Sequence, residues 1–135
     1  MTIITRTPEE TEAAGFDFAG TLPLSCVVGL YGDLGSGKTC FVRGAARALD
    51  VQGTVSSPTF SLVNVYPGRR GVIHMDAYRL KSPAEMVRIG FEDYLASGGV
   101  CFIEWADRLA PLLPRNALKV RFSITGDCLR EIVLP

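Results

Sequence analysis

The chain has 135 residues, of which 47% are hydrophobic and 21% are charged, and its 14 basic residues balance its 14 acidic residues. This length predicts a single domain, residues 1–135, with a sizeable core, and this composition excludes a disordered chain. The zero net charge provides no global attraction to nucleic acid or an anionic membrane, so we expect any RNA contact to be local or made through a partner. No apolar run approaches the roughly 18 residues of a membrane span and the opening residues lack a signal core, which predicts a cytoplasmic protein.

The four cysteines predict free thiols rather than disulfides. Cys26, Cys40, Cys101 and Cys128 show no CxxC spacing, and three of them lie within or beside apolar runs. This placement is typical of buried thiols in a reducing compartment. We therefore expect no structural zinc site.

The first part of the chain predicts a helix, a strand and a second helix. Thr7 is a suitable N-cap, Pro8 fits the first helical position and acidic residues follow, so a helix is expected to begin there. The segment SCVVGLY, Ser25–Tyr31, is short, apolar and β-branched, which favours a buried strand. After a glycine-rich loop, Thr39–Asp50 carries apolar residues at helical spacing, which predicts an amphipathic helix.

The second part predicts further strands. Ser61–Tyr66 alternates as a half-buried strand does, while Gly71–Asp76 and Val100–Trp105 are apolar and end in or near a carboxylate. Near the C-terminus, two alternating segments flank Gly126–Asp127, which predicts a hairpin with a two-residue connection. This edge of the sheet is therefore expected to be antiparallel.

One helix is expected between these strands, over Pro83–Ala96. Ser82 and Glu85 form a capping pattern at its start, and Pro83 fits its first turn. Gly90 lies in the middle of this helix and weakens it.

The glycine-rich loop GDLGSGKT, Gly32–Thr39, matches the phosphate-binding pattern G-x-x-x-x-G-K-[ST] in full and lies between a strand and a helix. In such a loop, inward backbone N–H groups and the positive end of the following helix hold a polyphosphate. Lys38 is expected to reach the β and γ oxygens, and Thr39 to offer its hydroxyl to Mg²⁺. A purely structural glycine turn is the alternative. The fold class that follows is α/β, a three-layer sandwich of the P-loop NTPase type with a mixed sheet and an antiparallel C-terminal hairpin.

Two carboxylates are candidates for the metal and water chemistry of this loop. Glu104 ends an apolar strand at the edge where ligands bind in such sheets, so it can hold the metal or orient the attacking water. The alternative is a helix cap near Ala106. Asp76 ends its strand in the same way, and its alternative role is an ion pair with Arg79.

Three other residues near these strands have less specific interpretations. Thr59, in Ser57-Pro58-Thr59, can provide the hydroxyl of a switch loop that senses the γ-phosphate. His74 is more typical of a satisfied, semi-buried residue than of a proton shuttle, and we assign it no catalytic role. Trp105 can close over a nucleotide or face a partner, but a single tryptophan is more typical of a core.

Five segments, taken in order, resemble the TsaE family, also called YjeE, over about Thr7–Leu113. They are GDLGSGKT, SPTF at 57–60, HMDAYR at 74–79, GFEDYL at 90–95 and FIEW at 102–105. The resemblance implies an ATPase that assists bacterial synthesis of threonylcarbamoyladenosine in tRNAs that read codons beginning with adenine. It also implies docking on the TsaD–TsaB pair, in which TsaD transfers the group from threonylcarbamoyl-AMP, and a hydrolysis step that resets the assembly between turnovers.

The same resemblance implies roles for individual residues. Lys38, Asp76 and Glu104 are expected to be catalytic, with Thr39, Asp76 and Glu104 around Mg²⁺. The segment Thr5–Glu10 is implied to surround the adenine. The residues implied to contact ATP or ADP are Gly32, Asp33, Leu34, Gly35, Ser36, Gly37, Lys38, Thr39, Cys40 and Thr59.

Other functions use the same loop. A small-molecule kinase would transfer the γ-phosphate to an acceptor, but the chain has no long arginine-rich insertion to serve as a lid. A GTPase would need an NKxD stretch, which is absent, and a module that only binds ATP remains open if Glu104 is merely a cap. No segment resembles an arginine finger, so we expect slow hydrolysis in isolation and faster turnover with TsaD–TsaB.

Overall fold

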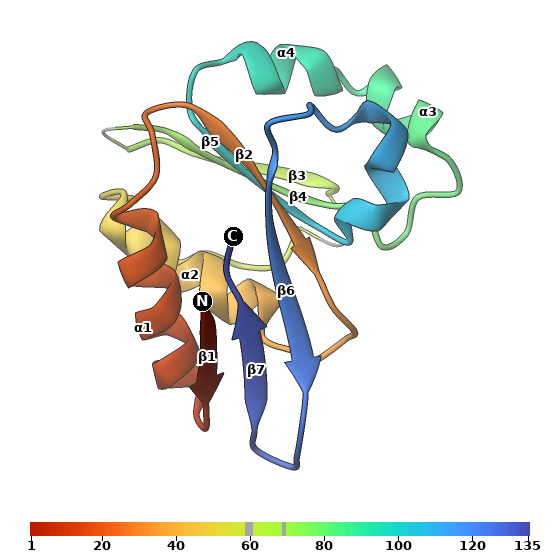
Figure 1. The fold of residues 1–135 in the computed structure, drawn as a ribbon. Coiled ribbons are helices and arrows are strands. Elements are labelled where there is room, and N and C mark those ends of the chain that lie inside the picture. Colours follow the sequence, from red (N-terminus) through yellow and green to blue (C-terminus); the bar gives the residue numbers. More distant parts are fainter. Residues whose placement is uncertain (59–60, 69) are drawn as a thin grey trace.

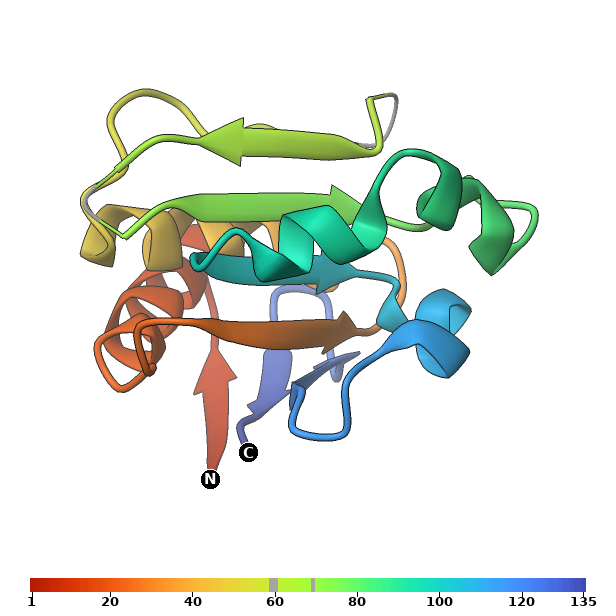
Figure 2. The ribbon, with the colours of Figure 1, turned by 90° about the horizontal axis from the view of Figure 1, so that it is seen from above.

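A seven-stranded mixed sheet forms the centre of the computed structural model, which describes residues 1–58, 61–68 and 70–135. The strands are β1 (Thr2–Thr5), β2 (Cys26–Tyr31), β3 (Val63–Tyr66), β4 (Val72–Asp76), β5 (Val100–Glu104), β6 (Leu118–Ile124) and β7 (Arg130–Val133). The helices are α1 (Pro8–Ala19), α2 (Lys38–Ala48), α3 (Pro83–Arg88), α4 (Phe91–Ala96) and the 3-10 helix η1 (Ala106–Leu112). Figures 1 and 2 show α1 and α2 on one face of the sheet and α3 and α4 on the other. The predicted three-layer α/β class is therefore confirmed.

The strand order β1-β7-β6-β2-β5-β4-β3 places a parallel centre between antiparallel edges. β2 runs parallel to β5 and β6, and β4 runs parallel to β5. β3, β7 and β1 each join their neighbour in the antiparallel sense, which confirms the antiparallel C-terminal hairpin. Because β2, β4 and β5 share one direction, their carboxyl ends meet at the same edge of the sheet, where ligands bind in sheets of this kind.

Two hydrophobic cores lie on the two faces of the sheet. On the α1 and α2 face, Phe41 is fully buried, with its ring centroid 5.3 Å from that of Phe122 and 5.6 Å from that of Phe18. On the other face, Met86 of α3 and Phe91 of α4 pack with residues of β4, β5 and η1. Both faces of the central strands are thus covered, as their nearly continuous apolar sequences require.

Helices α1 and α2 pack so closely that two glycines have no room for a side chain. A Cβ on Gly15 of α1 would lie 2.9 Å from the carbonyl carbon of Phe41, and one on Gly44 of α2 would lie 2.6 Å from that of Glu12. Real Cβ atoms do not approach carbonyl carbons this closely, so the crossing depends on these two glycines. This close crossing holds α2 in place, and the amino end of α2 forms part of the candidate site described below.

The predicted helix over Pro83–Ala96 is two helices, which corrects that expectation. Gly90 adopts a left-handed backbone with φ of 95° between α3 and α4, and such a residue ends a helix. The Ser82 side chain makes no capping hydrogen bond, whereas the Glu85 carboxylate accepts one from the Lys81 backbone at 2.9 Å. No helix built from the described residues has the length and apolar character needed to cross a membrane.

Two features of the sheet edge formed by β6, β7 and β1 also differ from expectation. The connection between β6 and β7 is longer than the two residues Gly126–Asp127, because the Thr125 N–H already closes the turn on the Leu129 carbonyl at 3.2 Å. In addition, the first residues of the chain form β1, in which Thr2 pairs with Val133 of β7. β1 thereby places the start of α1 beside the C-terminal hairpin.

The cysteines differ widely in burial. Cys101 is 2% exposed, and burial raises the pKa of its thiol to about 12. Cys26 and Cys40 are half-buried and Cys128 is exposed, so only one of the three thiols expected to be buried is fully so.

We expect a short pulse of iodoacetamide to label Cys128 first. Cys101 should be labelled at a rate at least roughly a thousandfold lower. The reactive species is the thiolate, and Cys101 can form it only when the surrounding core opens, which costs several kcal/mol. Peptide mass spectrometry after labelling, with the protein unfolded in urea as a control, measures both rates. Similar labelling rates for Cys101 and Cys128 in the folded protein would contradict this burial.

Candidate functional site

The glycine-rich loop connects the end of β2 to the start of α2 and leaves the amino end of that helix open. Gly37, the N-cap of α2, has a φ of 105° and makes no side-chain capping hydrogen bond. The first backbone bond of the helix runs from the Phe41 N–H to the Gly37 carbonyl at 2.9 Å, so the amides of the first turn have no acceptor within the helix. These amides, together with the helix dipole, form an anion-binding position.

Lys38 is held beside this position by the loop itself. Its side chain is buried at 4% exposure, and its Nζ donates hydrogen bonds to the carbonyl oxygens of Gly32 and, at 3.0 Å, Asp33. The same nitrogen lies 4.3 Å from the ring centroid of Trp105. Burial lowers the pKa of Lys38, while nearby carboxylates, Glu104 foremost, oppose the shift. The lysine charge is thus partly desolvated, which strengthens its attraction to an anion.

Glu104 joins the sheet to α2 across the site. It ends β5 with 4% exposure, and its Oε2 accepts a hydrogen bond from the Thr39 hydroxyl at 2.9 Å. The same oxygen lies 2.6 Å from Nε2 of His74. The Glu104 carboxylate therefore contacts the last residue of the loop. The Thr39 hydroxyl and this carboxylate together offer hard oxygen ligands of the kind Mg²⁺ requires.

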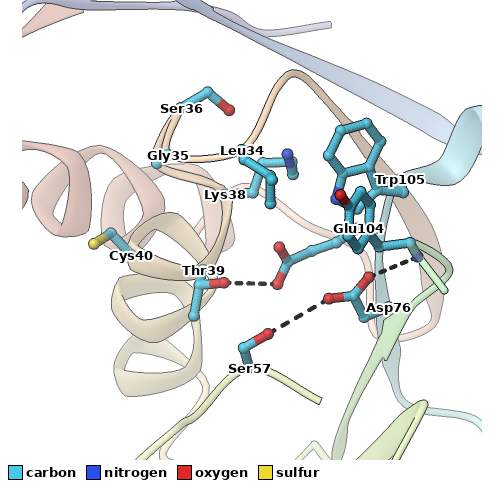
Figure 3. A pocket seen from close by; sticks show the side chains of 12 residues that line it. Leu34, Gly35, Ser36, Lys38, Thr39, Cys40, Ser57, Asp76, Glu104 and Trp105 are labelled. Carbon is cyan, nitrogen blue, oxygen red and sulfur yellow. Dashed lines mark hydrogen bonds between the residues drawn. The ribbon is translucent and has the colours of Figure 1, made fainter. Parts of the chain in front are cut away.

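Asp76 lies beside Glu104 because β4 and β5 are paired in register at these two residues. It is 3% exposed. Its Oδ1 accepts a hydrogen bond from the Tyr78 backbone at 2.8 Å, and its Oδ2 accepts one from the Ser57 hydroxyl at 3.4 Å. Figure 3 shows both carboxylates pointing into the same pocket from neighbouring strand ends.

The pocket between these groups has a volume of about 300 Å³. Gly32 and Asp33 do not line this pocket, but their carbonyl oxygens accept the hydrogen bonds that hold Lys38 beside it. Thr59 lies outside the described residues. The lining residues are Leu34, Gly35, Ser36, Gly37, Lys38, Thr39, Cys40, Ser57, Asp76, Tyr78, Glu104 and Trp105. Most of the residues expected to contact a nucleotide are thus brought together around one pocket.

Two residues occupy other places than expected. Trp105 is half-buried and packs against the edge of a core rather than inside it. It lines the pocket, has a left-handed φ of 57° and packs on Tyr78 with ring centroids 4.9 Å apart and ring planes tilted by 40°. His74 is fully buried rather than semi-buried, and it contacts Glu104. The His74-x-Asp76 spacing already places both side chains on one face of a strand, and this signal was available in the sequence.

A second pocket of about 230 Å³ adjoins the loop on its other side. Thr7 and Pro8, within the segment expected near an adenine, line it together with Cys40 of α2. Residues of the C-terminal hairpin also line it, and Arg130 donates a hydrogen bond from Nε to the Gly35 carbonyl at 3.0 Å. The hairpin, which lies outside the Thr7–Leu113 segment that carries the family resemblance, therefore contacts the loop directly.

The protein oxygens at this site suit a cation whose other ligands come mainly from a bound nucleotide and water. Within residues 1–58, 61–68 and 70–135, no three His, Cys, Asp or Glu side chains gather as a metal site. A divalent cation beside Thr39 and Glu104 would then complete its coordination with phosphate oxygens and water, which is how Mg²⁺ is usually bound with nucleotides.

Comparisons with known proteins agree with this arrangement. The family model described as "Threonylcarbamoyl adenosine biosynthesis protein TsaE" matches residues 5–132. The "tRNA threonylcarbamoyladenosine biosynthesis protein TsaE" of Treponema pallidum is 39% identical over 134 residues, 99% of each chain. The protein of the same name from Bacillus subtilis is 38% identical over 126 residues, 93% of this chain and 78% of the relative.

A solved structure is similar over nearly the whole fold. The crystal structure of Bacillus subtilis YdiB matches 98% of this chain and 82% of its own, with a TM-score of 0.83 and 34% identity. Both the extent of the family match and the identity to its members exceed what a shared P-loop alone would give. The chain belongs to the TsaE family.

Proposed function

We propose that this protein hydrolyses ATP to ADP and phosphate, with Mg²⁺, as an accessory protein of tRNA threonylcarbamoyladenosine synthesis in the cytoplasm. Membership of the TsaE family supports the process. The observation that carries the chemistry is the 2.9 Å hydrogen bond between Thr39 and Glu104, beside the uncapped amino end of α2. It brings a hydroxyl, a carboxylate and an anion-binding helix end to one point.

Each residue then has a role in hydrolysis. The loop amides and Lys38 hold the β- and γ-phosphates, and Thr39 and Glu104 hold the metal or its waters. When bound, Mg²⁺ supplies a Lewis acid that neutralises charge developing on the phosphate oxygens. Asp76, fixed by two hydrogen bonds beside Glu104, orients the water that attacks the γ-phosphate. Thr59 is the proposed sensor of that phosphate.

The adenosine end of the nucleotide is proposed to occupy the second pocket. This pocket meets the first at Gly35, Gly37 and Cys40, so a nucleotide following the loop passes from one to the other. Thr7 and Pro8 would lie against the base or ribose from the α1 side. The C-terminal hairpin would close the other side through Arg130.

Partner dependence is the second part of the proposal. No arginine lines the phosphate pocket among the residues that the structure describes. The neighbouring Arg108 packs on Tyr78 and Trp105, at 5.5 and 5.9 Å from their ring centroids, and donates to the Leu80 carbonyl. We therefore propose that hydrolysis is slow in isolation and faster when the protein docks on TsaD–TsaB, which it resets between turnovers, with tRNA contacted through the complex.

Release of phosphate from Mg-ATP, measured with and without TsaD–TsaB, tests this function. We expect slow release from the isolated protein and at least about tenfold faster release in the complex, since a cationic group supplied in trans often accelerates hydrolysis by more than that. Equal rates would contradict partner dependence. ADP formed only with an added acceptor, without free phosphate, would instead identify a kinase, and no ADP under any condition would leave a binding module.

The lowered pKa of Lys38 leads us to expect that nucleotide binding depends on pH. Burial lowers the pKa of Lys38 in the free protein, and a bound triphosphate favours the charged amine and raises it again. Binding should therefore take up protons as the pH approaches the lowered pKa of the free amine, and affinity should fall as the pH rises through that pKa. Calorimetry in buffers of different ionisation enthalpy measures the uptake. In Lys38→Arg, whose side chain stays charged, any binding that persists should show no uptake.

A further inference from the structure

The single histidine of the chain is buried against the proposed metal ligand. His74 has no exposed surface, and its Nε2 lies 2.6 Å from Oε2 of Glu104. The same Oε2 accepts the hydroxyl hydrogen bond of Thr39 at 2.9 Å. Two groups from opposite sides, one on β4 and one on α2, therefore hold one carboxylate oxygen. This arrangement is more specific than hydrophobic packing requires.

The hydrogen-bond partners determine which ring nitrogen of His74 carries the proton. A carboxylate oxygen that accepts from Thr39 requires a donor at Nε2 if that 2.6 Å contact is to be a hydrogen bond. Nδ1 is buried and has no hydrogen-bond partner within the part of the chain that the structure describes. A hydrogen on Nδ1 would thus be buried without an acceptor, which costs more than a bare lone pair there. The favoured form has the proton on Nε2.

We infer that His74 is a positioning residue, whose Nε2–H holds Oε2 of Glu104 so that Oε1 faces the phosphate pocket. In Figure 3 the oxygen of Glu104 that is not bonded to Thr39 turns toward Lys38 and Leu34, which line that pocket. The inference rests on the proposed function, because the oriented carboxylate is the one assigned to the metal. Outer hydrogen bonds of this kind fix ligand orientation, and their loss commonly costs 10- to 100-fold in affinity or activity.

The tautomer is directly measurable, because one histidine gives one imidazole signal set. Long-range ¹H–¹⁵N correlation spectra of the ¹⁵N-histidine-labelled chain should show Nε2 protonated and Nδ1 bare. The Glu104→Gln variant, whose amide can donate to the ring, should shift the Nε2 resonance. A proton on Nδ1 with Nε2 bare would overturn the inference. This experiment uses the unsubstituted protein and requires no ATPase activity, so its outcome is separable from failure of the proposed function.

A matched pair of substitutions tests the effect on catalysis. Glutamine places an amide nitrogen near the position of the imidazole Nε2, whereas asparagine is too short to reach Glu104. We expect His74→Asn to lower kcat for ATP hydrolysis about 10- to 100-fold with KM changed less than about threefold, and His74→Gln to restore most of the rate. In a Glu104→Gln background, the same His74→Asn change should have no further effect. A folded His74→Asn variant with full kcat, or an undiminished effect in that background, would overturn the inference.

Discussion

Replacing Lys38 by alanine is expected to lower kcat/KM for ATP hydrolysis by at least about 100-fold. The buried Nζ is held by the carbonyls of Gly32 and Asp33 at the point where the β- and γ-phosphates are proposed to lie. Removing it takes away a charge-assisted contact that no described neighbouring cation replaces in this pocket. Phosphate release with the TsaD–TsaB pair present measures the rate, and nucleotide titration measures the loss of binding. Lys119→Ala, on the exposed side of β6, is the matched control and should leave the rate unchanged.

The contrasting variant is Glu104→Gln. It removes one charge at the metal position and leaves the loop amides and Lys38 in place, so ATP should still bind while kcat falls about 100- to 1,000-fold. The two variants together separate phosphate binding from cleavage. Hydrolysis at the normal rate in both would show that the chemistry lies elsewhere on the molecule.

Gly44→Ala is expected to lower the free energy of unfolding by about 3 kcal/mol or more. In most helix interiors the same change stabilises a protein by up to about 1 kcal/mol, because alanine favours the helix. Here the new Cβ would lie 2.6 Å from the Glu12 carbonyl carbon, so α1 and α2 must separate along their whole contact. Urea denaturation of both proteins measures the difference in the free energy of unfolding, provided that their m-values are equal.

Gly20→Ala provides the matched control for this prediction. Gly20 follows the last turn of α1 with an ordinary helical φ of −63°, and its nearest atom to a new Cβ is the Asp17 carbonyl oxygen at 3.4 Å. Its effect should therefore stay within about 1 kcal/mol, in either direction. A Gly44→Ala protein as stable as the parent would mean that the two helices are not packed as closely as described.

The elements around the loop were predictable because local chemistry decides them. Thr7 caps α1 as expected, with the Glu10 N–H donating to its hydroxyl at 3.1 Å. The apolar segments became β2 and β5, since a fully buried strand must be apolar on both faces. Phe41 and Ala45, at helical spacing, turn toward the core as predicted.

The features that were missed depend on contacts between distant parts of the chain. β1 has only four residues and exists because β7 provides an edge to pair with. The roles of Gly15 and Gly44 arise from the crossing of two helices, although the small residues around both glycines were a usable signal. Gly90 was recognised as a weak point, but the sequence alone did not show that its backbone is left-handed and divides the segment into α3 and α4.

In the candidate site, the sequence predicted which residues have suitable chemistry, and tertiary structure determined which of them meet. The motif and the strand ends pointed to Lys38, Thr39, Glu104 and Asp76, and all four line one pocket. The 2.6 Å contact of His74 with Glu104 depends on the pairing of β4 with β5, which no local pattern specifies. The proposed roles of these residues stay predictions until activity is measured.

A crystal structure with Mg²⁺ and a non-hydrolysable ATP analogue would test whether this loop and Glu104 form the ATP site. We expect the triphosphate along the Gly32–Thr39 loop, with the metal bound by the Thr39 hydroxyl and, directly or through water, by Glu104. The Lys38 Nζ would then contact the β- and γ-phosphates. A triphosphate bound away from this loop, or a metal on the far side of the pocket from Thr39, would show that the ATP site lies elsewhere.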